Sequence, residues 1–396
     1  MANREGDYSR PTVKRRAMRT GYTTGACAAA ASKAAVRSLL TGEPVSEVTI
    51  HLPMGQDATF HIHRCEFLHG SRDGSKVLCS VIKDGGDDPD VTSGAEICST
   101  VSVNGDRATD RVTLAGGPGV GTVTKPGTGI PVGDPSITRV PRRMIAQAVV
   151  DTADSLGSNQ AFLVEISVPG GEEIARKTDN PRLGIVDGIS ILGTTGVVQP
   201  FSTAAWRASV NVSIDVAAAN GLPQMVISTG TQSEEFTKRY LDLPDMAYVN
   251  VGIFTGSALK RCVQRGIGRA ILVGMVGKFS KIAMGKFVTH VAGNKVDPEF
   301  LTSLAAECGA SPDVQAEMRQ STTARHFQEI AQSHGVTTVF DLICRKVCEQ
   351  SKIHVGDRGG GLIVDSICFD FEGDILGQAT TSDEPLVLTA KASASE

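Results

Sequence analysis

The spacing of hydrophobic positions divides the chain into two parts near Phe201. Before that point, apolar and polar residues alternate in short runs, which is the pattern of half-buried strands. These runs are EVTIHL from Glu47, ATFHIH from Ala58, VLCSVIK from Val77, ICSTVSV from Ile97, RVTLAG from Arg111 and FLVEISV from Phe162. One alanine-rich helix precedes them over about 24–40, with Thr23 or Thr24 as its cap and Gly42 at its end. Dense strands after a single helix predict an α+β domain.

After Phe201 the pattern becomes an alternation of helices and strands. The predicted order is a helix ending at Gly221, strand MVISTG, a helix from Ser233, strand AYVNV, a helix over 257–264, strand AILVGMV, three helices (after Asp297, over 324–333 and over 338–349) and a strand pair over 362–376. This alternation predicts a parallel sheet wrapped by helices, in which ligands bind at the carboxyl ends of the strands. We therefore expect a two-domain α/β protein: a flexible basic N-terminus over 1–19, an α+β domain over 20–200, an α/β domain over 201–388 and a disordered tail over 389–396.

Composition narrows the class of protein. The chain has 396 residues, 41% hydrophobic and 21% charged, with a formal net charge of -4. This charge argues against a nucleic-acid partner, since nucleic-acid surfaces carry a basic excess. No apolar run is long enough for a membrane span, and the N-terminus has no signal-peptide core, so we expect a cytoplasmic protein. The sequence leaves open whether the protein forms a homo-oligomer.

Cysteine and histidine spacing predicts no protein metal site. The nine cysteines are odd in number and irregularly spaced, which suits reduced thiols better than a disulfide framework or a zinc module. His61 and His63 alternate on a predicted strand and can point to one face. With no third ligand nearby in the sequence, they do not predict a site for a free metal ion.

The loop KDGGDDPDVTSG places Asp84, Asp87, Asp88 and Asp90 within seven residues. Carboxylates this close repel one another unless a cation or a hydrogen-bond donor compensates them. The spacing does not fit a calcium-binding EF-hand. An acidic turn shaped by glycine and proline explains the loop as well as a ligand site in which Asp87 or Asp88 accepts protons or hydrogen bonds from ring nitrogens.

A second loop, AGGPGVGTVTKPGTGIPVGDPSITRVPRRM, combines glycines with basic residues and leads into a helix predicted to begin at Pro141. Glycines allow backbone amides to approach a ligand. The basic residues are Lys125, Arg139, Arg142 and Arg143. A phosphate-binding loop would continue as Gly-Lys-Ser/Thr into a helix, so a nucleotide triphosphate is disfavoured. Separated cations suit a wide ligand with several anionic groups, although each alone is also compatible with a solvated surface position.

Small residues end two strands of the second domain, in STGTQS from Ser228 and in VGMVGKFSK from Val273. Such residues open a crevice for a nucleoside-like ligand, although glycine at a strand end also serves packing alone. The alanine helix over about 24–40 raises a related question: its small side chains leave room for something larger, which is either a ligand or another part of the protein.

Five blocks of this sequence together resemble the cobalt-precorrin-5B C1-methyltransferase family of cobalamin biosynthesis. They are GYTTGACAAAASKAA, KDGGDDPDVT, GPGVGTVTKPG with VGDPSITRVPRRM, GISILGTTGVVQPFS, and LVGMVGKFSKIAMGKFVTH. They occur in the family's order and cover most of the chain over about 21–297. The resemblance implies transfer of a methyl group from S-adenosylmethionine to C1 of cobalt-precorrin-5B, giving cobalt-precorrin-6A. Cobalt then enters only as part of the substrate.

The resemblance also suggests where each ligand binds. The first domain becomes a substrate-binding domain, with Thr23, Thr24, Gly25, Asp87, Lys125, Arg139, Arg142 and Arg143 as the candidate substrate residues. The second becomes a Rossmann-like domain that binds S-adenosylmethionine through Thr229, Gly230, Thr231, Gly274, Gly277 and Lys278. Positioning of the donor methyl against C1 is expected to dominate catalysis. A base that removes a ring proton afterwards is assigned to Asp88 or His290.

Two departures from the family pattern keep alternatives open. Met275 stands where the resemblance leads us to expect a histidine, and STGTQS stands where a proline and an asparagine are expected. A non-catalytic carrier of corrinoid precursors, or an enzyme acting on the cobalt-free precorrin, would explain such changes. A small-molecule kinase ranks last, because the Gly-Lys-Ser/Thr sequence is missing.

Overall fold

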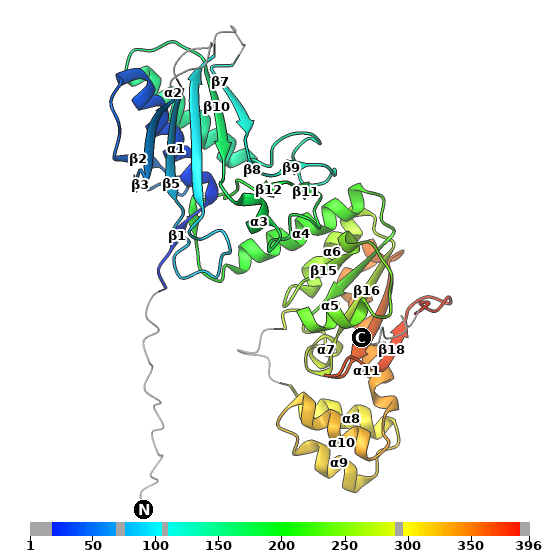
Figure 1. Ribbon diagram of the computed structural model, residues 1–396. Helices are drawn as coiled ribbons and strands as arrows, with labels where there is room; N and C mark the ends of the chain where they lie inside the picture. Colours follow the sequence, from blue (N-terminus) through cyan, green and yellow to red (C-terminus); the bar gives the residue numbers. More distant parts are fainter. Residues whose placement is uncertain (1–17, 69–75, 105–109, 290–295, 389–396) are drawn as a thin grey trace, which may run out of the picture. The chain divides into compact units, whose positions relative to one another are not determined.

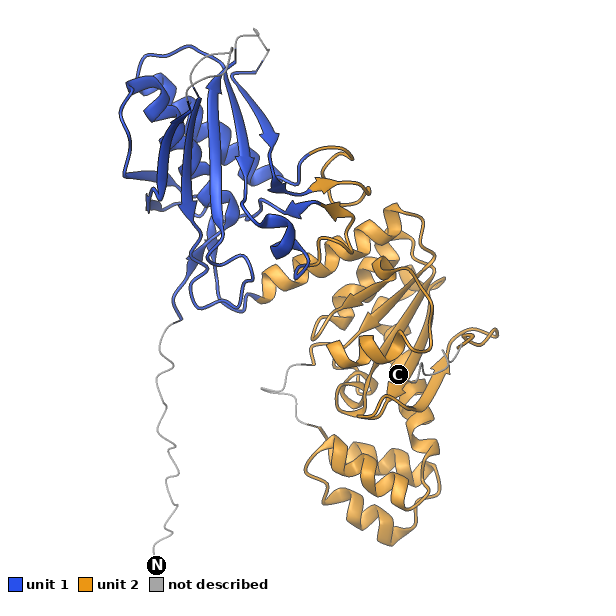
Figure 2. Ribbon diagram, in the orientation of Figure 1, with its two compact units in different colours: residues 1–121, 135–178, 187–202 blue, residues 122–134, 179–186, 203–396 orange. Residues whose placement is uncertain are grey.

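The computed structural model describes residues 18–68, 76–104, 110–289 and 296–388, and the chain forms two compact units (Figure 2). Unit 1 comprises Met1–Gly121, Pro135–Thr178 and Asp187–Ser202, and unit 2 comprises Thr122–Asp134, Asp179–Val186 and Thr203–Glu396. The two short segments assigned to unit 2 lie inside the range that the sequence predicted as one contiguous domain. The predicted tail over 389–396 and most of the predicted flexible N-terminus lie outside the described residues.

Unit 1 contains a five-stranded sheet in the order β4-β5-β6-β10-β7, in which β10 and β7 are parallel and the other pairs antiparallel (Figure 1). Its elements are β1 (Gly21–Tyr22), α1 (Thr24–Thr41), β2 (Glu47–His51), β3 (Asp57–His61), β4 (Arg64–Leu68), β5 (Lys76–Ile82), β6 (Glu96–Val103), β7 (Val112–Gly116), β8 (Gly119–Val120), α2 (Arg139–Ser155), β10 (Phe162–Ser167), α3 (Gly171–Ala175), β12 (Gly188–Ile189) and β13 (Val197–Val198). β2 and β3 form a separate antiparallel pair. The unit is therefore of α+β type.

Helix α1 is the centre of the unit 1 core. Its cap is Thr23, whose Oγ1 accepts a hydrogen bond from the Ala26 amide at 3.2 Å, and Gly42 ends it with φ of 74°. The alanines of α1 are buried, and the helix packs against β5, β6, β2 and α2. A Cβ added at Gly25 would lie 2.5 Å from the Pro141 ring of α2. The alanine face is thus small because the protein's own sheet and helices approach it closely, which answers the question raised by the sequence.

Unit 2 contains a second five-stranded sheet in the order β15-β14-β16-β17-β18 (Figure 1). Its elements are β9 (Thr122–Val123), β11 (Ile185–Val186), α4 (Thr203–Ala219), β14 (Gln224–Ser228), α5 (Thr231–Thr237), η1 (Asp245–Ala247), β15 (Tyr248–Asn250), α6 (Thr255–Arg265), β16 (Arg269–Met275), α7 (Val276–Ala283), α8 (Pro298–Glu307), α9 (Pro312–Arg319), α10 (Ala324–Ser333), α11 (Thr338–Val355), η2 (Asp357–Gly359), β17 (Ile363–Phe369) and β18 (Ile375–Thr380). The first four strands of the sheet are parallel, and β18 is antiparallel to β17.

The sequence prediction missed several elements, among them α3, β4, α7 and α9. β4 is short and only partly buried, although its polar and apolar residues alternate over 64–67. α7 follows β16 without a loop, and the prediction read its first residues as the end of the strand. α9 is a short helix with one buried residue, Met318, and shows little apolar periodicity. Three helices also start two residues earlier than predicted: α2 at Arg139, α5 at Thr231 and α6 at Thr255.

Candidate functional site

The parallel sheet of unit 2 reverses its strand order at β14. The chain passes from β14 to β15 on one side and then to β16 on the other side of β14. At such a reversal the connections leave in opposite directions, which opens a crevice outside the carboxyl ends of the two central strands. Those ends are Ser228 of β14 and Met275 of β16. All six predicted donor-binding residues end or closely follow these two strands at this edge.

The backbone at this edge is held by contacts between the two strand ends. The Thr229 amide donates to the Val273 carbonyl at 3.0 Å, and Nζ of Lys278 donates to the Thr229 carbonyl. A Cβ added at Gly274 would lie 2.5 Å from Oγ1 of Thr229, so glycine permits this close approach. Gly230 has extended backbone, and a Cβ there would lie 3.7 Å from Nζ of Lys278. The structure thus brings Thr229, Gly230, Gly274 and Lys278 together.

Lys278 carries its charge in a partly enclosed position. Burial lowers the pKa of Lys278, and the neighbouring charge of Lys281 lowers it further. Its hydrogen-bond partner is the neutral Thr229 carbonyl, which compensates a charge less than a carboxylate does. An anionic group entering the crevice would stabilise this ammonium.

Thr231 and Gly277 have different surroundings. Thr231 begins α5, and its Oγ1 accepts a hydrogen bond from the Asn250 side chain at 3.1 Å. Gly277 faces α10, since a Cβ there would lie 3.4 Å from that of Ala324. Glycine at position 277 therefore lets α7 pack closely against α10, and this position does not face the strand ends.

Sequence reasoning missed two residues at this edge, Asn250 and Trp206. Asn250 ends β15, and its carbonyl accepts from the indole nitrogen of Trp206 at 3.4 Å. The indole is 42% exposed and packs edge-on against Phe254 at 5.8 Å between ring centroids. The rule that ligands bind at strand ends identifies Asn250 in AYVNV, but Trp206 comes from α4 and carries no comparable signal.

The acidic loop of unit 1 lies between β5 and β6, and its carboxylates have partners within the protein. Asp84 pairs with the guanidinium of Arg19, and Asp87 accepts from the Arg19 amide at 2.7 Å. Asp88 accepts from the Phe201 amide at 2.8 Å through Oδ1. Asp90 pairs with the buried Nζ of Lys83 at 2.7 Å. Arg19 is therefore bound to this loop and is not part of a free basic tail.

Thr24 and Gly25 connect α1 to the segment that follows β12. Oγ1 of Thr24 donates to the Ser190 carbonyl at 3.2 Å and accepts from the Leu192 amide at 2.9 Å. The Gly25 amide donates to the Leu192 carbonyl at 3.0 Å. Thr23 and Thr24 are both buried. These residues build the loop, and their polar atoms are satisfied within the protein.

The glycines near β8 bring backbone against backbone. Gly119 has φ of 77°, and a Cβ there would collide with the Val168 carbonyl. A Cβ at Gly171 or Gly188 would in turn collide with the backbone of Gly119. Three chain segments therefore meet at Gly119, and this close packing explains why the position is glycine. Binding of a ligand by the loop amides is not needed to explain it.

The four predicted cations differ in their surroundings. The Arg142 guanidinium donates to the Ile137 carbonyl at 2.7 Å and to the Pro135 carbonyl at 3.1 Å, so it fixes the loop before α2. Arg139 and Arg143 are exposed on the same helix. Arg143 lines a pocket of about 330 Å³ together with Lys33. Lys125 belongs to unit 2, where its side chain lies against Gly184.

The remaining site predictions concern metals and His290. His290 lies outside the described residues. Within the described part of the chain, no group of three or more His, Cys, Asp or Glu side chains is arranged to hold a metal ion. None of the helices in the described ranges combines the length and apolar character needed to span a bilayer.

Comparison with known proteins gives long matches. Several similar proteins carry the name cobalt-precorrin-5B C(1)-methyltransferase, and three of them show the extent of the match. The protein from Geobacillus sp. (strain WCH70) is 45% identical over 93% of this chain and 98% of its own. The protein from Salinispora tropica is 46% identical over 93% of this chain and 95% of its own. The protein from Thermus thermophilus is 46% identical over 88% of this chain and 91% of its own.

A crystal structure of the cobalamin biosynthesis protein cbiD from Archaeoglobus fulgidus is 24% identical to this chain. The match covers 80% of this chain and 85% of the cbiD chain, with a TM-score of 0.37. Residues 11–200 match the family described as CbiD, and residues 288–380 match its C-terminal domain. With these matches and the identity to full-length relatives, the chain belongs to the CbiD family.

Proposed function

We propose that this protein is an S-adenosylmethionine-dependent methyltransferase, acting in the cytoplasm, that methylates C1 of cobalt-precorrin-5B to give cobalt-precorrin-6A. The observation that carries the proposal is the 45% identity, over 93% of the chain, to a protein named for this activity. The match spans both units, so it includes the acidic loop and α1 of unit 1 as well as the strand ends of unit 2.

In this proposal unit 2 is a Rossmann-like domain that binds the methyl donor at the carboxyl edge of β14 and β16. Donor binding is assigned to Thr229, Gly230, Thr231, Gly274 and Lys278, with Gly277 in a supporting position on α7. The half-buried ammonium of Lys278 fits the carboxylate at the amino-acid end of S-adenosylmethionine, because that group would replace a neutral partner with an anion. S-adenosylmethionine supplies an activated sulfonium methyl group.

The strand edge also offers contacts for the nucleoside part of the donor. Gly230 lets a ligand approach the backbone beside Lys278, because its position has no side chain. Asn250 and the exposed indole of Trp206 provide a polar group and an aromatic face at the neighbouring strand end. We assign the ribose and the adenine to this side of the crevice.

Unit 1 is the proposed substrate-binding domain. Corrin precursors carry acetate and propionate groups at their rim, and exposed Arg139 and Arg143 are suited to bind them. Thr23, Thr24, Gly25 and Arg142 are proposed to contribute by holding the loops of unit 1 in place. Lys125 belongs to unit 2 and is not assigned to this domain. Asp88 is the proposed base within the described residues. Its hydrogen bond to Phe201 uses Oδ1, which leaves Oδ2 for a ring proton.

The test is incubation of the purified protein with cobalt-precorrin-5B and methyl-labelled S-adenosylmethionine, followed by mass analysis of the pigment. Label on C1 is the expected result. Full binding of both ligands without transfer would contradict the proposal and favour a corrinoid carrier. Parallel incubation with the cobalt-free precorrin shows whether the metal is needed.

A further inference from the structure

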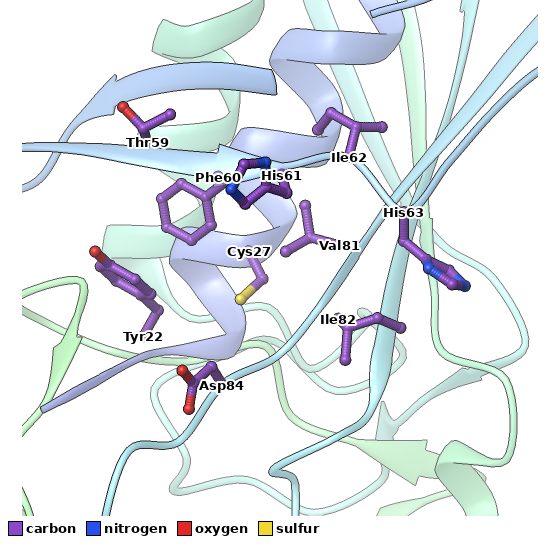
Figure 3. A pocket seen from close by; sticks show the side chains of 10 residues that line it. All are labelled: Tyr22, Cys27, Thr59, Phe60, His61, Ile62, His63, Val81, Ile82 and Asp84. Carbon is purple, nitrogen blue, oxygen red and sulfur yellow. The ribbon is translucent and has the colours of Figure 1, made fainter. Parts of the chain in front are cut away.

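A pocket of about 450 Å³ opens in unit 1 between the start of α1, the β3 end and β5 (Figure 3). Its volume falls within the range of about 300–1,000 Å³ that is usual for small-molecule sites. The rings of Tyr22 and Phe60 lie 4.5 Å apart between centroids on one side, and Ile62, Val81 and Ile82 add aliphatic surface. Ile82 is 42% exposed, although it is a large apolar residue. The pocket therefore offers an apolar surface against which a flat ring can lie.

Two imidazoles line this apolar pocket. His61 ends β3, and His63 follows two residues later, just before β4. Both residues are exposed, and among the described residues neither ring nitrogen makes a hydrogen bond within the protein. Neutral imidazole is a good ligand for divalent transition metals. The two histidines do not belong to any cluster suited to a free ion in the described chain.

A metal that is already held by a macrocycle has a different requirement. The ring nitrogens of a cobalt corrin occupy the equatorial positions, so only axial positions remain for the protein. A single imidazole then suffices where a free ion would need three or more protein ligands. The lack of a third ligand beside His61 and His63 argues against a site for a free metal ion. It does not argue against a site for a cobalt that a macrocycle already holds.

We propose that this pocket receives one face of the cobalt macrocycle and that His61 or His63 supplies an axial nitrogen ligand to its cobalt. The inference rests on the proposed function, because it takes the cobalt from that substrate. The bond forms from the imidazole lone pair, and a solvent ligand leaves the cobalt, so no electron or proton is transferred. It fixes the height and tilt of the ring, which is the kind of positioning that methyl transfer to one ring carbon requires.

Two other residues of the pocket do not compete for the metal. Burial raises the pKa of the Cys27 thiol to about 12, so the thiolate that would bind cobalt is scarce at neutral pH. Asp84 is paired with Arg19, whose hydrogen bond lowers the pKa of this carboxyl group. The imidazoles are the available nitrogen ligands of the pocket.

The experiment uses the whole 396-residue chain and cobyrinic acid with its cobalt reduced to the divalent state. This probe is a cobalt corrin with free side-chain carboxylates and no nucleotide base of its own. Electron paramagnetic resonance detects an axial nitrogen as a triplet splitting of the cobalt lines. We expect the triplet with wild type, and a doublet with protein containing histidine enriched in the heavy nitrogen isotope.

Variants identify the ligand. The double variant His61→Ala/His63→Ala is expected to lose the triplet, to regain it with added imidazole, and to bind the probe at least tenfold more weakly. The single variants show which histidine is the ligand. His51→Ala is the control, because His51 is an exposed histidine of the same unit that pairs with Asp57. It lines the separate pocket that contains Arg143 and not this one. Circular dichroism and thermal unfolding confirm that each variant is folded.

The inference would be overturned by absence of nitrogen splitting in wild type or by its retention in the double variant. Loss of the triplet in His51→Ala alone would likewise place the cobalt on another face. Methyl transfer to cobalt-precorrin-5B is measured in parallel on wild type. Methyl transfer without nitrogen splitting would support the proposed function and refute the axial ligand. Nitrogen splitting without methyl transfer would support the axial ligand and refute the proposed function.

Discussion

Lys278→Met tests whether the crevice at the β14 and β16 ends binds the amino-acid end of the donor. Methionine keeps much of the apolar stem and removes the ammonium that now donates to the Thr229 carbonyl. A hydrogen bond between charged groups contributes about 1.5–3 kcal/mol. Since about 1.4 kcal/mol is a factor of ten in affinity, the dissociation constant of S-adenosylmethionine should rise about 10- to 150-fold.

Three ligands measured by isothermal titration calorimetry separate the possible roles of Lys278. S-adenosylhomocysteine keeps the carboxylate but has no sulfonium charge, and it should lose affinity as much as S-adenosylmethionine does. Methylthioadenosine lacks the amino-acid end, so its affinity should hardly change. If Lys278 instead lay beside the sulfonium, removing its charge would relieve repulsion, and S-adenosylmethionine alone would bind more tightly.

The matched control is Lys286→Met, which removes an exposed lysine shortly after α7. It should leave all three affinities unchanged. Unaltered binding of S-adenosylmethionine and S-adenosylhomocysteine by a folded Lys278→Met protein would refute the assignment. An equal loss for methylthioadenosine would also refute it, because that result indicates a general collapse of the crevice.

Three further predictions concern packing, charge and the substrate rim. Gly274→Ala places a methyl group 2.5 Å from Oγ1 of Thr229, so thermal unfolding should show a loss of about 1–3 kcal/mol together with weaker donor binding, whereas Gly277→Ala should be nearly neutral. Lys83→Met leaves the carboxylate of Asp90 without its ion pair, and urea unfolding should show a loss of about 3 kcal/mol at neutral pH. Burial raises the pKa of Asp90, but hydrogen bonds from Lys83 and Thr92 outweigh burial, so the pKa is lowered overall. The Lys83–Asp90 pair should therefore stabilise the fold at pH values above the usual aspartate pKa. This stabilisation should vanish as the pH falls through the lowered pKa of Asp90. Arg143→Ala should weaken binding of the carboxylated pigment several-fold in a fluorescence titration and leave donor affinity unchanged; equal losses for both would contradict a rim role.

Sequence patterns predicted most elements of this fold, because strands and helices with one buried face repeat their apolar residues at a fixed period. The α1 cap at Thr23 and its end at Gly42 agree with the structure, since both signals are local. α9 was missed because only Met318 of its residues is buried, which leaves no period to detect. The extra segments of unit 2, 122–134 and 179–186, were also not foreseen, because which segments pack together depends on contacts between distant residues.

The candidate donor site was easier to locate from sequence than the pocket in unit 1, and the reason is topological. In a parallel sheet, each strand brings its carboxyl end to the same edge, so STGTQS and VGMVGKFSK could be placed together without knowing any side-chain contact. The pocket around Phe60 instead combines the start of α1, the end of β3 and the end of β5, and no single rule predicts that meeting. His61 and His63 were noticed in the sequence as a pair without a third ligand. The role proposed for them depends on two further features, the apolar pocket around Phe60 and a metal that arrives with its own ring nitrogens.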